Sequence, residues 1–155
     1  MSALLPAGSA ALPRSTLRRV SAGDEGDLCV MYRSFEPKGA ACGLPPREHP
    51  EQWLASLRGC PSFLLEIEGR ALAHGVLCCQ SRACTAELAL FVHQDWRGHG
   101  FGRQLLRALV EEARQLGLRR VWGLAEPWNH SMRRLAVSAG FRPCSGGTFA
   151  MELEP

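Results

Sequence analysis

The sequence predicts a single α/β domain whose mixed, mostly antiparallel central sheet is flanked by helices. The length of 155 residues, with 46% hydrophobic and 21% charged side chains, is typical of one globular domain. Three apolar segments in the middle of the chain are joined by short turns, which indicates an antiparallel meander. The second half alternates strand and helix patterns, so the fold belongs to the mixed α/β class.

The first part of the chain combines a leader, a strand, a helix and a long loop. Residues 1–14 are small and apolar, and we expect a flexible leader before a domain that spans residues 15–155. A strand at 16–20 precedes a helix capped near Asp24. The inward side of this helix is predicted from helical spacing: Leu28, Met31, Tyr32 and Phe35. The proline-rich loop at 36–50 is long for a compact domain, so we expect it to shape a substrate entrance.

The remaining elements are predicted from apolar periodicity and from glycines that end helices. They are a short helix at 51–57, strands at 63–67, 71–79 and 85–92, a helix ending at Gly117, a strand at 119–124, a helix ending at Gly140, and a strand at 149–153.

Charge and cysteine content exclude several classes of protein. The net charge of +3 is too small to indicate a nucleic-acid partner, and 17 of the 18 basic residues are arginine, with Lys38 the only lysine. No apolar segment is long enough to span a membrane and no secretory signal is evident, so we expect a cytoplasmic protein without a membrane partner. Seven cysteines without a CxxC pair predict neither a disulfide framework nor a metal site.

The most informative segment is the glycine-rich loop 97–103, which lies between a predicted strand and a long amphipathic helix. Glycines at alternate positions let the backbone turn tightly and expose N–H groups at the positive end of the helix, where an anion such as a diphosphate binds. A P-loop requires Lys and then Ser or Thr, whereas Arg103 and Gln104 follow here. A dinucleotide fingerprint requires a glycine where Arg103 stands.

The loop resembles the cofactor motif of the GNAT superfamily of N-acetyltransferases, which is Arg or Gln, two residues, Gly, one residue, then Gly or Ala. Arg97, Gly100 and Gly102 fill this pattern. The resemblance extends over residues 85–142, although Gln94 stands where proline is common. Its later part consists of Asn129, Met132, Leu135, Gly140 and Phe141. In detail, residues 86–89 and the helix around Leu135 and Ala136 are most similar to bacterial Pat-type protein lysine acetyltransferases.

The resemblance implies that acetyl-CoA is the cosubstrate and that an amine is the acceptor. The diphosphate would lie on the glycine loop, the pantetheine arm would pair with backbone at 90–92, and Asn129, unless it is only a helix cap, would contact the arm from the other side. The residues expected to bind the cosubstrate are Leu90, Phe91, Val92, Arg97, Gly98, His99, Gly100, Phe101, Gly102, Arg103 and Asn129. His93 and His99 flank the loop, and lone histidines there more often face solvent. Weak dimers are common in the superfamily, so a homodimer remains open.

Acetyl transfer to an amine needs a base, because an alkylamine with a pKa near about 10.4 is protonated at neutral pH. A carboxylate or a chain of waters can accept this proton. Glu87 lies four residues before Phe91 on the predicted strand, and Pat-type enzymes carry their proposed base in the similar place. The alternative for Glu87 is a solvated acid on a strand face, without a catalytic role. Alternation places Glu87, Ala89 and Phe91 on one face. A backbone N–H near Phe91 or Val92 would stabilise the developing oxyanion if a bulge freed it from the ladder.

The function predicted from these residues is acetyl transfer to a primary amine, such as a protein lysine, by direct attack on the thioester. Two alternatives stay open: a small-molecule acceptor such as a polyamine, amino acid or antibiotic, and a non-catalytic sensor of acyl-CoA. The missing general acid favours the sensor. Ala136 stands where many GNAT enzymes carry a tyrosine that protonates the leaving thiolate. The only tyrosine, Tyr32, lies in the first helix.

Overall fold

The computed structural model describes residues 12–39, 41–80 and 82–154 and confirms the predicted fold class. Its sheet has seven strands in the order β1-β2-β3-β4-β5-β7-β6, and every neighbouring pair is antiparallel except β4 and β5. The strands are β1 (Thr16–Arg19), β2 (Ser62–Ile67), β3 (Arg70–Gln80), β4 (Thr85–Val92), β5 (Arg120–Leu124), β6 (Arg142–Pro143) and β7 (Thr148–Glu152). The expected leader lies mostly outside the described residues.

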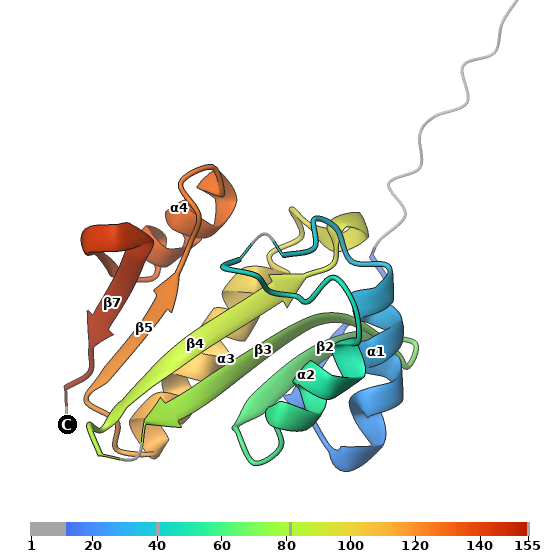
Figure 1. Ribbon diagram of the computed structural model, residues 1–155, viewed down its shortest axis with the longest axis horizontal. Helices are drawn as coiled ribbons and strands as arrows, with labels where there is room; N and C mark the ends of the chain where they lie inside the picture. Colours follow the sequence, from blue (N-terminus) through green and yellow to red (C-terminus); the bar gives the residue numbers. More distant parts are fainter. Residues whose placement is uncertain (1–11, 40, 81, 155) are drawn as a thin grey trace, which may run out of the picture.

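Among the described residues, four α-helices cover the sheet. They are α1 (Glu25–Arg33), α2 (Pro50–Ser56), α3 (Phe101–Gln115) and α4 (His130–Ser138). Helices α1 and α2 lie on one face, α3 lies on the other, and α4 lies beside β5 and β7 (Figure 1). The sheet therefore separates two apolar layers, and the strands that carry the candidate site run between them.

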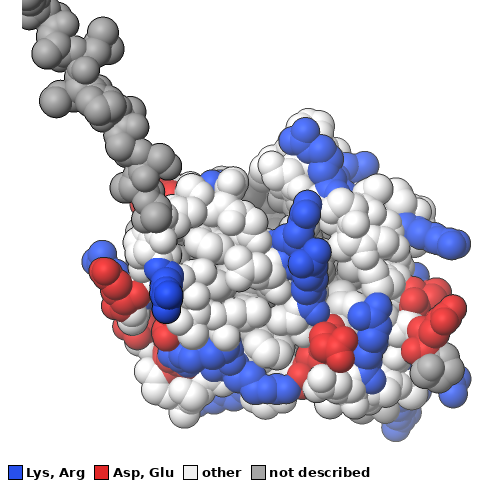
Figure 2. Space-filling model, turned by 180° about the vertical axis from the view of Figure 1, so that it is seen from behind, with Lys and Arg blue, Asp and Glu red and all other residues white. Residues whose placement is uncertain are grey.

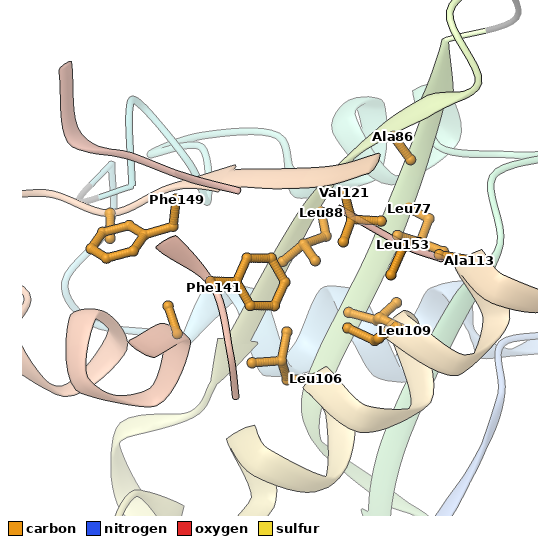
Figure 3. Close-up of a cluster of buried hydrophobic side chains, with 13 residues drawn as sticks. Leu77, Ala86, Leu88, Leu106, Leu109, Ala113, Val121, Phe141, Phe149 and Leu153 are labelled. Carbon is orange, nitrogen blue, oxygen red and sulfur yellow. The ribbon is translucent and has the colours of Figure 1, made fainter. Parts of the chain in front are cut away.

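The layer under α3 is the larger hydrophobic core. Leu106, Leu109 and Ala113 on one side of α3 are buried against side chains of the sheet (Figure 3). Their helical spacing is the pattern from which this helix was predicted. At Gly75 on β3 the helix comes so close that an added Cβ would lie 2.8 Å from a Leu109 methyl carbon. This packing fixes the position of the first turn of α3, which follows the glycine loop.

The layer under α1 and α2 is rich in aromatic rings. Tyr32 on α1 is fully buried, and its hydroxyl lies 2.7 Å from Nδ1 of the buried His74 on β3. The Tyr32 ring also meets Trp53 and Phe91 in edge-to-face contacts with centroids 5.0 and 5.9 Å apart. Burial lowers the pKa of His74 to about 4, so this histidine is neutral at physiological pH. Ala41 and Leu44 of the loop at 36–50 pack against this layer.

Two details differ from expectation. Asp24 makes no side-chain cap to α1, because its carboxylate is held instead by the Arg18 guanidinium at 2.8 Å and by the Ser21 backbone N–H at 2.7 Å. These contacts, of which the hydrogen bond from Arg18 has the largest effect, hold the pKa of Asp24 well below its usual range. The two-residue strand β6 was not predicted, because two residues carry no alternation.

Candidate active site

The two parallel strands β4 and β5 begin together and then separate. Their pairing covers only Thr85 to Glu87 opposite Arg120 to Trp122. Beyond that point the two strands diverge towards α4 (Figure 1). At Gly123, one residue past the paired segment, an added Cβ would lie 3.0 Å from the Leu88 carbonyl oxygen, so the strands are still close there. The half of β4 that follows Leu88 is therefore hydrogen-bonded on its β3 side alone among the described strands.

The backbone of β4 presents polar groups to this opening without a bulge. The register between β3 and β4 runs unbroken, and the His93 N–H donates to the Leu72 carbonyl at 2.9 Å. In an antiparallel ladder the residues that bond to the partner alternate, so Leu90 and Val92 direct their N–H and C=O groups away from β3. The backbone of Phe91 faces β3. The paired residues of β3 and β4 therefore contain no bulge, and it is the divergence of β5 that leaves the Val92 N–H without a ladder partner.

The glycine loop ends in a set of free backbone donors. Gly98 and Gly100 have φ of 81° and 82°, a left-handed conformation that favours glycine, and Gly100 is the N-cap of α3. Within the described part of the chain, no N–H from Gly100 to Arg103 donates a hydrogen bond, whereas the next one, of Gln104, donates to the Gly100 carbonyl at 3.2 Å. Four amide donors at the positive end of a 15-residue helix fit a diphosphate.

The loop side chains take up different positions. Phe101 is buried beneath the loop, and His99 is exposed with its ring 6.2 Å from that of Trp96. Gly102 is closely covered, because an added Cβ would lie 3.1 Å from a Leu135 methyl carbon on α4. Arg103 lines a groove of about 530 Å³ between α3, α4 and β7, together with Arg107 and Arg114. Figure 2 shows arginines crossing this back face of the molecule.

Arg97 points towards the loop at 36–50 rather than out of the glycine loop. Its Nε donates to the Val92 carbonyl at 3.1 Å, and its Nη2 donates to the Glu36 carbonyl at 2.8 Å. The guanidinium also lies 5.4 Å from the centre of the Phe35 ring. Burial lowers the pKa of Arg97, although the guanidinium stays charged.

Glu87 stands in the middle of the sheet, opposite Cys78 on β3 and Trp122 on β5. Its strand face is the predicted one, since Ala89 and Phe91 pack into the aromatic layer under α1 and α2 while Leu88 packs under α3. The loop at 36–50 reaches the same region, where the Cys42 thiol lies 3.8 Å from an oxygen of Glu126.

The thiols near Glu87 are kept in the protonated form. Burial raises the pKa of Cys78 to about 11, with the neighbouring Cys60 and the charge of Glu87 adding to the effect. Burial also raises the pKa of Cys42, and the carboxylates of Glu126 and Glu87 contribute. At neutral pH neither thiol is an effective nucleophile.

Asn129 is the N-cap of α4, with its Oδ1 accepting the Met132 N–H at 3.1 Å. Its amide nitrogen has no hydrogen bond within the described part of the chain and can still serve a ligand. Ala136 is buried on the same helix, and the Tyr32 hydroxyl is occupied by His74. The expectation for His93 was wrong, because its side chain is buried against the end of α1 and its Nε2 lies 3.0 Å from the Ser34 hydroxyl.

Sequence reasoning missed one residue of this region. Gln94 was noted only as a departure from a common proline, yet its amide contacts the backbone of residues 34–36 twice. The departure from proline at this position was the signal that could have pointed to it.

No helix in the described ranges is long and apolar enough to cross a membrane.

The chain matches a known protein family over most of its length. The profile of the acetyltransferase (GNAT) family matches residues 28–141, which is most of the chain. An acetyltransferase of Pseudomonas aeruginosa is 29% identical over 76 residues, which are 49% of this chain and 40% of that protein. The matched segment thus spans less than half the length of this curated relative.

Solved structures share the fold over nearly the whole chain. An N-acetyltransferase from Staphylococcus aureus covers 91% of this chain and 99% of its own, with a TM-score of 0.78 at 18% identity. The GNAT domain of S. lividans PAT covers 90% of this chain and 90% of its own, with a TM-score of 0.75 at 19% identity. A phosphinothricin acetyltransferase from Sinorhizobium meliloti in complex with acetyl-CoA covers 90% of this chain and 88% of its own, with a TM-score of 0.75 at 21% identity. At these identities the likeness concerns the fold alone.

Proposed function

This chain belongs to the GNAT family of acetyl-CoA-dependent N-acetyltransferases, and we propose that it transfers the acetyl group to the primary amine of a protein lysine by direct attack on the thioester. The observation that carries the proposal is the position of Glu87. It lies on the strand whose far end borders the free amide donors, and on the face that the loop at 36–50 covers.

The residues expected to bind acetyl-CoA fit a molecule with a diphosphate at one end of its pantetheine arm and a thioester at the other. The free N–H groups from Gly100 to Arg103 hold the diphosphate. The backbone of Leu90 and the carbonyl of Val92 pair with the amides of the pantetheine arm, which leaves the Val92 N–H for the thioester oxygen. Asn129 contributes its free amide nitrogen from the α4 side. In this arrangement Arg97 contributes its backbone to the loop, while its side chain supports the acceptor side. Acetyl-CoA itself supplies the activated acetyl group.

Glu87 acts as the general base. The lysine ammonium enters as a cation, and a carboxylate in the middle of the sheet both attracts it and accepts its proton, directly or through one water. The amine then attacks the carbonyl carbon, and the N–H of Val92 stabilises the negative charge that develops on oxygen. The carbon–sulfur bond then breaks, and the attacking nitrogen loses its second proton to water as the amide forms. The CoA thiolate takes up a proton from water, since a thiol with a pKa of about 8.5 is a tolerable leaving group.

Direct attack is favoured over an acyl-enzyme route by the state of the cysteines. Cys78 is the thiol closest to Glu87 in the sheet register, and burial raises its pKa to about 11. Because the thiolate is the reactive form, this cysteine is inert at neutral pH and would not accept the acetyl group from the cosubstrate.

The test compares Glu87→Gln with Glu154→Gln, an exposed carboxylate near the end of the chain. Free thiol released from acetyl-CoA is followed with lysine peptides, polyamines, amino acids and aminoglycosides as acceptors. We expect turnover on lysine peptides to fall about 100-fold or more in Glu87→Gln at pH 7 and to recover partly at high pH, where the amine loses its proton without help. Binding of CoA should be unchanged in both variants.

The panel also separates the alternatives. Turnover confined to one small amine would assign a small-molecule acceptor, as the name of the Sinorhizobium protein states for that enzyme. Binding of acetyl-CoA without turnover on any amine would indicate a sensor. Equal rates for Glu87→Gln and the parent protein would remove Glu87 from the mechanism.

A further inference from the structure

The segment that joins β4 to the glycine loop is fastened to the end of α1 by side chains. His93, Gln94 and Arg97 all reach residues 34–36, where α1 has ended and the loop at 36–50 begins. We call these contacts the strap (residues 34–36 with 93–97). It connects the part of the chain that contacts the cosubstrate with the part that covers the acceptor side.

Gln94 makes the central contact of the strap. Its Nε2 donates to the Ser34 carbonyl at 2.6 Å, and its Oε1 accepts the Glu36 N–H at 2.9 Å. One carboxamide thus satisfies an acceptor and a donor of the same short segment, as a neighbouring strand would do. Pro37 has no N–H, so the Glu36 amide that Gln94 binds is the last donor before this proline.

The other two side chains close the strap on either side. The ring of His93 accepts the Asp95 N–H at Nδ1 at 3.3 Å, and its Nε2 lies 3.0 Å from the Ser34 hydroxyl. Arg97 donates to the Glu36 carbonyl at 2.8 Å and covers the Phe35 ring. The carbonyls that follow a helix end need partners, and in this chain the segment before the glycine loop provides them.

We propose that Gln94 is a positioning residue that couples the loop at 36–50, on the acceptor side, to the glycine loop, so that binding of acetyl-CoA and binding of the amine acceptor reinforce each other. Proline, which is common at this place in the motif, has neither the donor nor the acceptor. The part of the proposal that concerns the acceptor rests on the proposed function. The physical link is that Gln94 and Arg97 belong to the segment between β4 and the free N–H groups of α3, so any ordering of that segment also orders residues 34–36.

The test uses Gln94→Met, which keeps the length of the side chain and removes both hydrogen bonds. The matched control is Gln115→Met at the end of α3, where the amide reaches only the Glu111 carboxylate at 3.3 Å. We expect the acceptor KM of Gln94→Met to rise about five- to tenfold, which is the loss expected for two partly exposed hydrogen bonds. The dissociation constant for CoA should change less than about threefold, as in the control.

A second measurement does not depend on catalysis. Amide hydrogen exchange is measured at Phe35 and Glu36 with and without saturating CoA. In the parent protein CoA should slow this exchange, and in Gln94→Met the slowing should disappear although CoA is bound. An equal response in both proteins would overturn the proposal, and so would an acceptor KM that does not change. If the parent protein acetylates no amine, the proposed function fails, and the exchange experiment alone decides whether Gln94 couples the two segments.

Discussion

Replacing Gly100 by tryptophan tests whether the free amide donors bind the cosubstrate. Gly100 has φ of 82°, and an added Cβ would meet no atom within 4 Å, so the indole would enter the open space in front of the helix. That space is the place proposed for the diphosphate. The expected result is loss of CoA binding in a protein that still folds.

The size of the effect follows from the contacts removed. Each hydrogen bond from an amide to a charged phosphate oxygen contributes about 1.5–3 kcal/mol, and blocking the loop removes at least two of them. The dissociation constant should therefore rise by a factor of about 100 to 10,000. The left-handed backbone adds about 1–2 kcal/mol of strain to the folded state of the variant.

Gly69→Trp is the matched control for this strain. Gly69 lies in the turn between β2 and β3, has φ of 75°, and also has no atom within 4 Å of an added Cβ. Both variants should lose a similar few degrees of melting temperature, about 3–8 °C for a domain of this size. Isothermal titration calorimetry should then show normal CoA affinity for Gly69→Trp and none for Gly100→Trp. An affinity of Gly100→Trp within about threefold of the parent protein would refute the placement of the diphosphate.

Two further predictions concern His74 and Asn129. Burial lowers the pKa of His74 from 6.5 to about 4, so as the pH falls below 6.5 the unfolded chain takes up a proton at this side chain while the folded protein does not. The free energy of unfolding should therefore fall by about 2 kcal/mol between pH 7.5 and pH 5. Urea unfolding at both pH values should show this loss in the parent protein and not in His74→Asn, and a parallel loss in both would contradict the prediction. Asn129→Ala should destabilise the protein by about 1 kcal/mol through the lost cap, and Asn129→Ser should restore most of that stability. Calorimetry on both Asn129 variants separates the roles, since a contact with the pantetheine arm weakens CoA binding in both and a pure cap weakens it in neither.

The elements of the fold could be predicted because each one satisfies a local rule. The strand β4 alternates between two apolar layers and the helix α3 repeats its apolar side chains with helical spacing, so their periods are visible in the sequence. The ends of elements depend on competition between contacts. Asp24 has the composition of a helix cap, but the nearby Arg18 offers a stronger charge-assisted contact, and the choice between them depends on tertiary structure.

The part of the candidate site that consists of backbone N–H donors could be predicted from the sequence. Glycines and a helix start are local features, so the donors of the loop could be read from the sequence. The strap could not, because Gln94 and Glu36 are 58 positions apart and their contact depends on how α1 meets the end of β4. Arg97 shows the same limit of local reasoning, since the motif names the residue and only the fold shows which carbonyls its side chain contacts. The roles of Glu87 and Asn129 stay predictions.

The near absence of lysine has a consequence for an enzyme that modifies amines. Seventeen arginines give the chain its positive charge, and a guanidinium stays protonated and does not attack a thioester. The one lysine ammonium, of Lys38, lies at the start of the loop at 36–50 and donates to the Arg33 carbonyl at 2.8 Å. The surface can therefore attract anionic partners and a polyphosphate coenzyme while offering almost no side chain that the reaction could consume. An acetyltransferase that carries arginine in place of lysine thus offers almost no side-chain amine to its own reaction.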